Sequence, residues 1–327
     1  MKLVIQIPCY NEEKTLPEAF AALPKQVEGF DEVEVLIIDD GSRDRTVAVA
    51  RELGIHHIVH FPGNRGLARG FMAGLDAALR VGADVIVNTD ADNQYDASFI
   101  PALVKPILDG RADMVIGDRQ VDQVSEFSAT KKRLQRFGSW VVRRASATEV
   151  PDATSGFRAL SREAALSLFV TSNYTYTLET IIQAGAARLA ITGVPVRTNA
   201  PTRESRLLRG MWNYVKRSMG TIIRIYTMYH PLRTFLTIAA LFFLAGVAAA
   251  GRFVYYFVTT DGQTGHTQSL ILAAILILAS FQIALSGFVA DLVGANRKLI
   301  ESVLRRVRSL EAGAGKNGGN RPGSANG

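Results

Sequence analysis

The chain contains almost no cysteine: Cys9 is the only one among 327 residues. A single cysteine excludes an intramolecular disulfide and is typical of a protein in a reducing compartment. A secretory signal peptide is not expected either, because the apolar run that opens the chain is short and is stopped by Pro8.

Charge is missing from two long segments. Residues 235–251 and 270–290 contain no charged side chain, and each approaches the roughly 20 residues that a bilayer crossing needs. The hydrophobic content of 48% is also high for a purely soluble protein. We therefore predict two transmembrane helices that form a hairpin, with Arg252 snorkelling toward the interface beside aromatic residues. Two buried core helices are the alternative.

Lysine and arginine are absent from the connecting loop, residues 259–268, but frequent on both sides of the hairpin. This asymmetry predicts that both termini and the domain before the hairpin are cytoplasmic. The net charge of +7 is concentrated beside the hairpin, where anionic lipid headgroups would attract it. A membrane partner is therefore expected, and a nucleic acid is not.

Up to about residue 196, short β-rich runs alternate with helical patterns, which is typical of an α/β domain with a parallel sheet covered by helices. The expected strands are residues 3–7, 33–38, 57–61, 84–88, 114–117 and 189–196, and helical patterns cover residues 44–53 and 66–81. Polar clusters follow each of the first four strands. Because ligand sites form at the carboxyl ends of such strands, these loops mark the expected site.

The cluster after the fourth strand holds Asp90, Asp92 and Asp96 within seven residues. Carboxylates this close repel one another unless a cation lies between them. Asp90 and Asp92, together with Gln94, offer oxygen ligands that suit Mg²⁺ or Mn²⁺, and such an ion usually completes its shell with phosphate oxygens. Taken alone, Asp-x-Asp fits a solvated turn or a helix cap equally well.

Four motifs in order change this balance: IPCYNEE (7–13), IIDDGSRD (37–44), NRG (64–66) and DADNQ (90–94). Together they resemble the family 2 glycosyltransferases of GT-A fold. DATSGFR (152–158), VPVRTN (194–199) and TRESR (202–206) resemble the branch that contains dolichol-phosphate mannose synthase and the polyprenyl-phosphate glycosyltransferases. The resemblance covers residues 1–206.

The resemblance implies roles for individual residues. Pro8, Tyr10, Glu12 and Asp39 would hold the nucleotide base and ribose, and the acceptor-only carboxylate of Asp39 suits a base N–H. Asp90, Asp92 and Gln94 would bind the metal, with Asp90 also part of the cofactor site. Asp40 or Ser42 is expected to cap the helix that follows.

Two places depart from the branch pattern. Gly117-Asp118-Arg119 stands where the branch often has Gly-Ser-Arg, and Arg203-Glu204-Ser205-Arg206 stands where Gly-x-Ser-Lys is usual. Arginine binds phosphate bidentately, so Arg119, Arg203 and Arg206 are candidates for phosphate contact. Further candidates for the acceptor phosphate are Lys131, Lys132 and Arg133, with Arg158 behind them. A basic face attracted to lipid in general explains each of them equally well.

The three histidines His56, His57 and His60 fall on both faces of the expected third strand, so we do not expect a metal site there. Cys9 is interpreted as a small buried residue beside the nucleotide loop.

The resemblance implies inverting, metal-dependent transfer of a hexose from a nucleotide sugar to polyprenyl phosphate, either undecaprenyl or dolichyl, at the cytoplasmic membrane face. The base pocket could serve UDP or GDP, and UDP is favoured. The acceptor phosphate is largely ionised near neutral pH and needs no strong base. Catalysis would then rest on Asp92 through the metal, with Asp152 orienting the acceptor, taking a residual proton or only capping a turn.

Two other functions stay open. A processive polysaccharide synthase of the same family would typically show a Gln-x-x-Arg-Trp motif and more membrane helices. A non-catalytic nucleotide-sugar binder or scaffold is the alternative from another class. The protein could also form a homo-oligomer. The expected order of segments is a GT-A catalytic domain (1–206), amphipathic interfacial helices (207–231), a transmembrane helix (232–258), an exoplasmic loop (259–268), a second transmembrane helix (269–292) and a basic cytoplasmic tail with a disordered end (293–327).

Overall fold

The computed structural model describes residues 1–119, 152–170, 176–199, 220, 223–224, 226–260 and 267–318. Two compact units make up the chain: an α/β unit, Met1–Ile222 with Glu301–Gly327, and a hairpin unit, Ile223–Ile300. Most of the expected interfacial helices, residues 207–231, lie outside the described residues, as do residues 261–266 of the connecting loop.

Seven strands of the described α/β unit form one sheet, ordered β3-β2-β1-β4-β6-β5-β7. They are β1 (Lys2–Cys9), β2 (Glu32–Asp39), β3 (His57–His60), β4 (Val85–Asn88), β5 (Met114–Asp118), β6 (Arg158–Ser161) and β7 (Ile191–Pro195). The six expected strands are confirmed. The sheet is mixed and not purely parallel, because β6, which was not predicted, runs antiparallel between β4 and β5.

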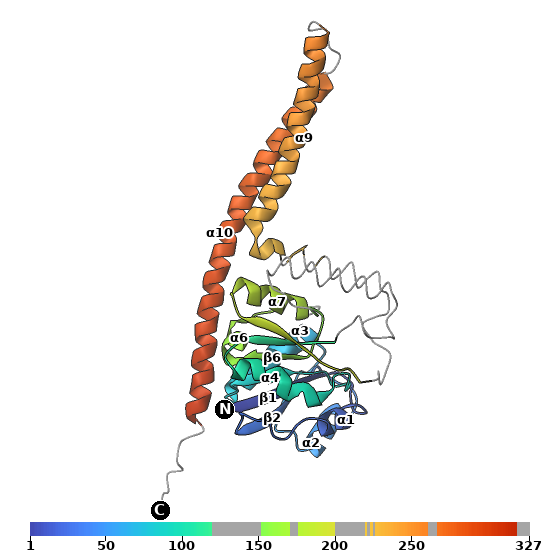
Figure 1. Cartoon of the computed structure of the whole chain (residues 1–327), viewed down its shortest axis with the longest axis vertical. Helices are drawn as coiled ribbons and strands as arrows, with labels where there is room; N and C mark the ends of the chain where they lie inside the picture. Colours follow the sequence, from blue (N-terminus) through green and yellow to red (C-terminus); the bar gives the residue numbers. More distant parts are fainter. Residues whose placement is uncertain are drawn as a thin grey trace, which may run out of the picture. The chain divides into compact units, whose positions relative to one another are not determined.

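Helices cover the sheet, as the burial of its central strands requires. All four residues of β4 are buried, so both of its faces are covered. The helix after β3 buries Phe71, Leu75 and Leu79, which recur at the spacing of one helical face. Besides the end of α10, the described helices of the α/β unit are α1 (Leu16–Ala21), α2 (Thr46–Glu52), α3 (Leu67–Arg80), the 3₁₀ turn η1 (Ala97–Phe99), α4 (Ile100–Leu108), α6 (Arg162–Ser167) and α7 (Thr177–Ala186) (Figure 1).

The hairpin unit consists mainly of α9 (Pro231–Thr259) and the first part of α10 (Thr267–Gly318), which run side by side (Figure 1). Two glycines make the close contact: a Cβ on Gly246 would lie 2.8 Å from Ile277, and one on Gly287 would lie 2.8 Å from Phe235. Small residues at such contacts are typical of helices packed in membranes.

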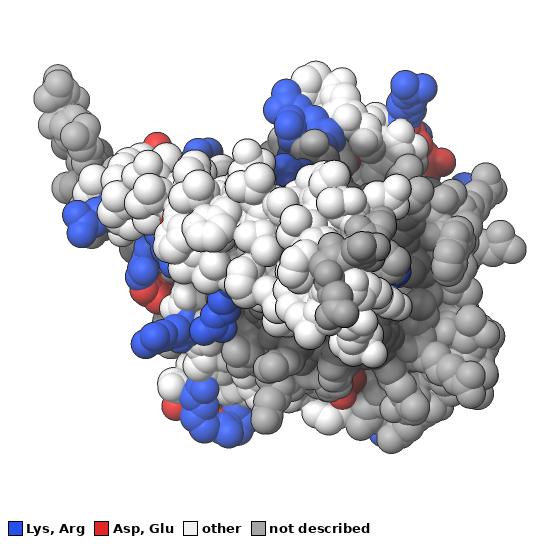
Figure 2. Space-filling model, turned by 90° about the horizontal axis from the view of Figure 1, so that it is seen from above, with Lys and Arg blue, Asp and Glu red and all other residues white. Residues whose placement is uncertain are grey.

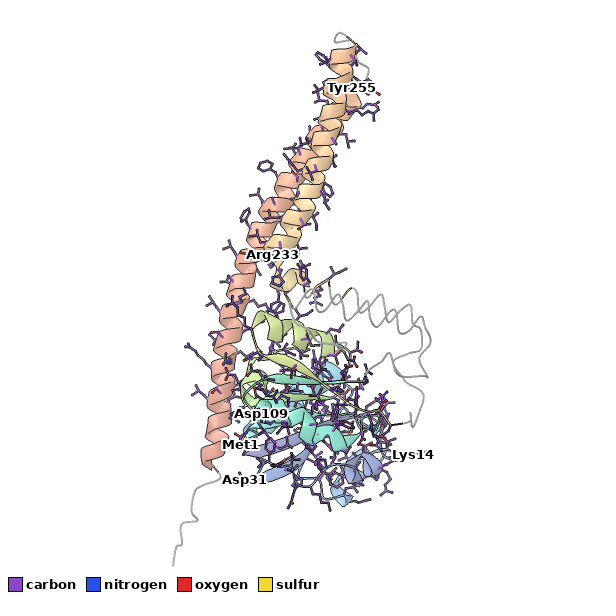
Figure 3. All side chains as sticks on the ribbon, in the orientation of Figure 1. Met1, Lys14, Asp31, Asp109, Arg233 and Tyr255 are labelled. Carbon is purple, nitrogen blue, oxygen red and sulfur yellow. The ribbon has the colours of Figure 1, made fainter. Side chains whose placement is uncertain are left out.

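Both helices are long and apolar enough to cross a membrane, by length and composition. Only 11% and 17% of their most apolar windows are buried in the protein, so they are not core helices, and that alternative is wrong. The described surface in Figure 2 is mainly uncharged, with lysine and arginine in separate groups. Figure 3 shows Arg233 and Tyr255 toward opposite ends of α9, and the guanidinium of Arg252 lies 5.8 Å from the ring centre of Tyr256.

The last turns of α10, from Glu301 onward, belong to the α/β unit. The tail, whose end was expected to be disordered, is helical as far as Gly318. Arg308 explains the attachment: it is 8% exposed, its Nε donates to Asp76 of α3 at 2.8 Å, and its Nη1 donates to the Leu168 carbonyl at the end of α6, also at 2.8 Å. A cation at the C-terminal end of a helix pairs with carbonyls that have no partner inside the helix.

Replacing Arg308 with alanine is expected to lower the free energy of unfolding of the α/β unit by about 2 kcal/mol, because hydrogen bonds made by a charged group are lost and their acceptors are left partly buried. Arg306→Ala is the matched control, since Arg306 is exposed on the same helix and its loss should change stability by less than about 0.5 kcal/mol. Thermal unfolding in detergent measures both variants. Equal melting temperatures would mean that α10 is not held by Arg308.

Candidate active site

The candidate site lies at one edge of the sheet. Strands β1 to β4 are mutually parallel, so the loops after them emerge together. Strand β6 is antiparallel, so it begins at this same edge, with Arg158 opposite Asn88 of β4 and Ile116 of β5. Asp152 lies shortly before β6 in the chain and is thereby brought toward the ends of β4 and β5.

Asp39 is the last residue of β2 and is fully buried. Its Oδ2 lies 2.7 Å from His60 Nδ1, and both of its oxygens accept the Ser42 N–H at 3.3 Å. A buried carboxylate held at a strand end by neutral donors and one imidazole can accept a further hydrogen bond from a ligand.

Asp40 joins two loops of the site. Its carboxylate accepts the N–H groups of Arg65 and Gly66, at 2.7 and 2.9 Å, just before α3. Gly41 permits this approach, because its φ is +73° and a Cβ there would lie 2.4 Å from the Gly63 backbone. Neither Asp40 nor Ser42 caps α2, whose N-cap residue is Arg45. That expectation was wrong because the two side chains bond to neighbouring loops instead.

The loop after β1 is tied to the loop after β2. The Asn11 N–H donates to Ser42 Oγ at 2.9 Å, and the Glu12 N–H donates to Thr46 Oγ1 at 2.8 Å. Glu12 is 5% exposed, and its carboxylate accepts the Thr15 hydroxyl at 2.7 Å. Pro8 and Tyr10 are partly exposed at the end of β1, whose Cys9 pairs with Asp39 in the sheet. The four residues expected at the nucleotide therefore lie at the ends of two paired strands and in the loop after β1.

Asp90 and Asp92 follow β4, and both are partly exposed. Asp92 Oδ1 accepts the Gln94 N–H at 3.2 Å. Gly156 faces Asp90: a Cβ on this glycine would lie 3.2 Å from Asp90 Oδ2, so any side chain would crowd the carboxylate. Within the described part of the chain, no three His, Cys, Asp or Glu side chains group as metal ligands. Two carboxylates close together in the chain suit an ion that takes its other ligands from phosphate and water.

A buried polar network that sequence reasoning missed supports Asp90. Asn88 Nδ2 donates to the Gly156 carbonyl at 2.8 Å and to the Tyr176 hydroxyl at 2.9 Å, while its Oδ1 accepts Gln6 Nε2 at 2.8 Å. The Tyr95 hydroxyl accepts the Gly156 N–H at 2.9 Å. These bonds fix the backbone of Gly156 beside Asp90. The only signal in the sequence is an asparagine that ends an apolar strand.

Asp152 forms an ion pair with Arg119, which follows β5. Arg119 Nε donates to Asp152 Oδ2 at 2.6 Å, and Nη2 donates to Oδ1 at 3.0 Å and to Thr154 Oγ1 at 2.7 Å. Burial raises the pKa of the Asp152 carboxyl, but the charge and hydrogen bonds of Arg119 outweigh it, so the pKa lies below the usual value. Asp152 therefore stays ionised and is a weak base.

Known proteins resemble the part of the chain that carries this site. Residues 4–169 match the sequence profile described as Glycosyl transferase family 2. An uncharacterised protein of Methanocaldococcus jannaschii is 32% identical over 205 residues, which are 60% of this chain and 81% of the relative. The chain belongs to glycosyltransferase family 2.

Two further similarities concern a relative of this glycosyltransferase and its fold. The polyprenol monophosphomannose synthase of Mycolicibacterium smegmatis is 28% identical over 206 residues, 60% of this chain and 76% of the relative. A crystal structure of glucosyl-3-phosphoglycerate synthase from Mycobacterium tuberculosis, in complex with Mn²⁺, UDP-glucose and phosphoglyceric acid, is 22% identical, with a TM-score of 0.56 over 69% of this chain and 79% of that one. The structural likeness confirms the GT-A fold.

Arg158 of the glycosyltransferase does not face an acceptor, and its prediction as a phosphate ligand is wrong. It is fully buried, and its guanidinium donates to the carbonyls of Ser155, Thr177 and Ala153 at 2.8, 2.8 and 3.0 Å. Burial lowers its pKa to about 10, so it remains charged at neutral pH. Arg158 holds the loop before β6 to α7. The other basic candidates Lys131, Lys132, Arg133, Arg203 and Arg206 lie outside the described residues.

The histidines do not converge. His57 Nε2 lies 2.8 Å from Glu34, while His60 bonds to Asp39 and His56 Nδ1 accepts the Val35 N–H. Cys9 is buried, and burial raises the pKa of its thiol well above the usual value, so the thiol is inert.

Proposed function

We propose that this glycosyltransferase transfers a hexose, with inversion, from a nucleotide sugar to polyprenyl phosphate at the cytoplasmic face of a membrane. A uridine nucleotide is favoured over a guanosine one. The observation that carries the proposal is the presence, in one chain, of the Asp90 and Asp92 edge and a hairpin of two helices long enough to cross a membrane. The similarity to a polyprenol monophosphomannose synthase supports it.

At the donor end, Asp39 accepts an N–H of the base, and Pro8, Tyr10 and Glu12 complete the pocket for base and ribose. Asp90 and Asp92, with Gln94, hold Mg²⁺ or Mn²⁺. The gap that Gly156 leaves beside Asp90 and the oxygen donors of both aspartates fit such an ion. Bound there, the ion would offset the negative charge that develops on the nucleoside diphosphate as it leaves.

At the acceptor end, Asp152 and Arg119 position the acceptor phosphate and do not deprotonate it. A phosphate monoester has its second pKa near 6, so it can attack the sugar without a general base. In the described part of the chain, Arg119 uses Nε and Nη2 on Asp152 and Thr154 and makes no hydrogen bond through Nη1, which can reach a phosphate oxygen. We assign closer contact with the lipid phosphate to Arg203 and Arg206.

The test is a panel of nucleotide sugars with long-chain polyprenyl phosphate and the purified full-length protein in detergent. We expect a labelled hexose from one UDP-sugar to move into the organic phase, with release of UDP. Exclusive use of a GDP-sugar would overturn the nucleotide preference. Binding of nucleotide sugars with no transfer to lipid phosphate would contradict the proposal as a whole.

The proposed topology makes its own prediction, because basic residues flank the hairpin and none lies in residues 259–268. A cysteine introduced as Thr260→Cys should react with a membrane-impermeant maleimide from the outside of intact cells only. Lys25→Cys, in an exposed loop of the α/β unit, is the matched control and should react only after the membrane is opened. The buried native Cys9 gives little background. The opposite labelling pattern would reverse the orientation.

A further inference from the structure

His60 is the side chain that most directly constrains the proposed base-binding carboxylate. Sheet register places His60 of β3 opposite Asp39 of β2, and the Nδ1–Oδ2 distance is 2.7 Å. Asp39 is fully buried, whereas 53% of the His60 side chain is exposed. The imidazole therefore lies on the solvent side of one carboxylate oxygen.

The direction of this hydrogen bond follows from the partners. An ionised carboxylate accepts hydrogen bonds and donates none, so Nδ1 carries the hydrogen and donates to Oδ2. Among the described residues, the other oxygen, Oδ1, accepts only the Ser42 N–H, at 3.3 Å. His60 thus engages one oxygen at short distance and leaves the other for a ligand.

We propose that His60 is a specificity residue that makes Asp39 select a base with a single ring N–H, as in uracil, over guanine. This inference rests on the proposed function, in which Asp39 accepts a hydrogen bond from the base. Uracil presents one N–H between two carbonyl oxygens and needs one carboxylate oxygen. Guanine presents two adjacent donors, N1–H and N2–H, which pair best with both oxygens of a carboxylate.

Guanine can make its second bond only by competing with His60 for Oδ2. If guanine does not displace His60 from Oδ2, one guanine donor is poorly paired. If it does, the imidazole N–H loses its acceptor. Either arrangement gives up one hydrogen bond to a charged acceptor, so both disfavour guanine. A protein that reads a base through paired polar groups rejects a base that leaves one of them unpaired.

Two substitutions at His60 separate hydrogen bonding from bulk. The side-chain amide of asparagine can place an N–H close to the position of Nδ1, so His60→Asn should keep the bond to Asp39, whereas His60→Ala removes it. His57→Asn is the matched control, because His57 lies on the same strand but bonds to Glu34, which also pairs with Lys2 at 3.0 Å.

The experiment measures the dissociation constants of UDP and GDP by calorimetry, with Mg²⁺, on the full-length protein in detergent. We expect the unmodified protein to bind UDP about 10-fold more tightly than GDP. His60→Ala should weaken UDP binding by about 5-fold and bring the two affinities within about 2-fold of each other. His60→Asn and His57→Asn should keep the preference for UDP.

The outcomes distinguish this inference from the proposed function. If both nucleotides bind and the ratio of their affinities is unchanged in His60→Ala, the role of His60 is overturned while the proposed function stands. A preference for GDP in the unmodified protein overturns the inference as well. If neither nucleotide binds, the proposed function fails and the inference fails with it.

Discussion

Replacing Asp92 with asparagine is expected to reduce the rate of sugar transfer by about 10³-fold, equivalent to about 4 kcal/mol of transition-state stabilisation. In the proposed mechanism Asp92 supplies an anionic ligand to the metal, and an amide oxygen is a much weaker ligand for Mg²⁺ or Mn²⁺. The fold should survive, because Asp92 is only partly buried and the hydrogen bond that it accepts from the Gln94 N–H can also be accepted by an amide oxygen.

Asp96→Asn is the matched control for this substitution. It removes a negative charge from the same loop but keeps the cap of η1, where Asp96 Oδ1 accepts the Ser98 N–H at 2.9 Å. Its activity should remain within about 3-fold of the unmodified protein, since asparagine caps helices as well as aspartate does. Chelation should abolish transfer by the unmodified protein. Full activity of Asp92→Asn, or full activity in chelator, would remove the metal from the mechanism.

Replacing Arg119 with methionine is expected to lower the free energy of unfolding by roughly 3–5 kcal/mol and to suppress transfer. The side chain of Asp152 is 1% exposed, so removing its partner leaves a buried charge uncompensated. Because the pKa of Asp152 is lowered in the folded protein, the pair stabilises above the ordinary carboxyl pKa of about 3.9 and loses this contribution as the pH falls below it. The difference in the free energy of unfolding between Arg119→Met and the unmodified protein should therefore become smaller at acidic pH.

The double variant Arg119→Met with Asp152→Leu separates stability from function. Replacing both members of a buried pair by apolar groups restores much of the stability that removing one member costs. We expect thermal unfolding of the double variant to approach that of the unmodified protein. Transfer should stay low, because in the proposed mechanism Asp152 and Arg119 position the acceptor. Recovery of transfer together with stability would show that the pair is only structural.

Much of the fold could be predicted because its strands are short apolar runs with polar loops after them. Strand β6 could not, since it is four residues long, begins with Arg158 and shows no alternation. Its place in the sheet depends on pairing with β4 and β5, which lie far away in the sequence. The attachment of α10 was missed for a similar reason, because one arginine among several in a basic tail gives no local sign that it is buried.

The candidate site, like the fold, could be predicted from the sequence only in part. Asp90 and Asp92 could be located because they follow a buried strand directly. The supporting bonds from Asn88 and Tyr95 to Gly156 join residues more than 60 positions apart, and no pattern in the sequence indicates them. His60 was set aside because only metal binding was considered. Its actual partner, Asp39, comes from the neighbouring strand.

The central claim is that the acceptor is a lipid phosphate, and a direct competition between acceptors tests it. The purified full-length protein would receive a labelled UDP-hexose, a divalent metal and equal concentrations of long-chain polyprenyl phosphate and phosphoglyceric acid, which is present in the crystal structure of the M. tuberculosis enzyme. We predict that the label moves into the organic phase as a polyprenyl-phosphate hexose, with an equal amount of UDP released. Label on phosphoglyceric acid, or release as free sugar with none on lipid, would contradict the account.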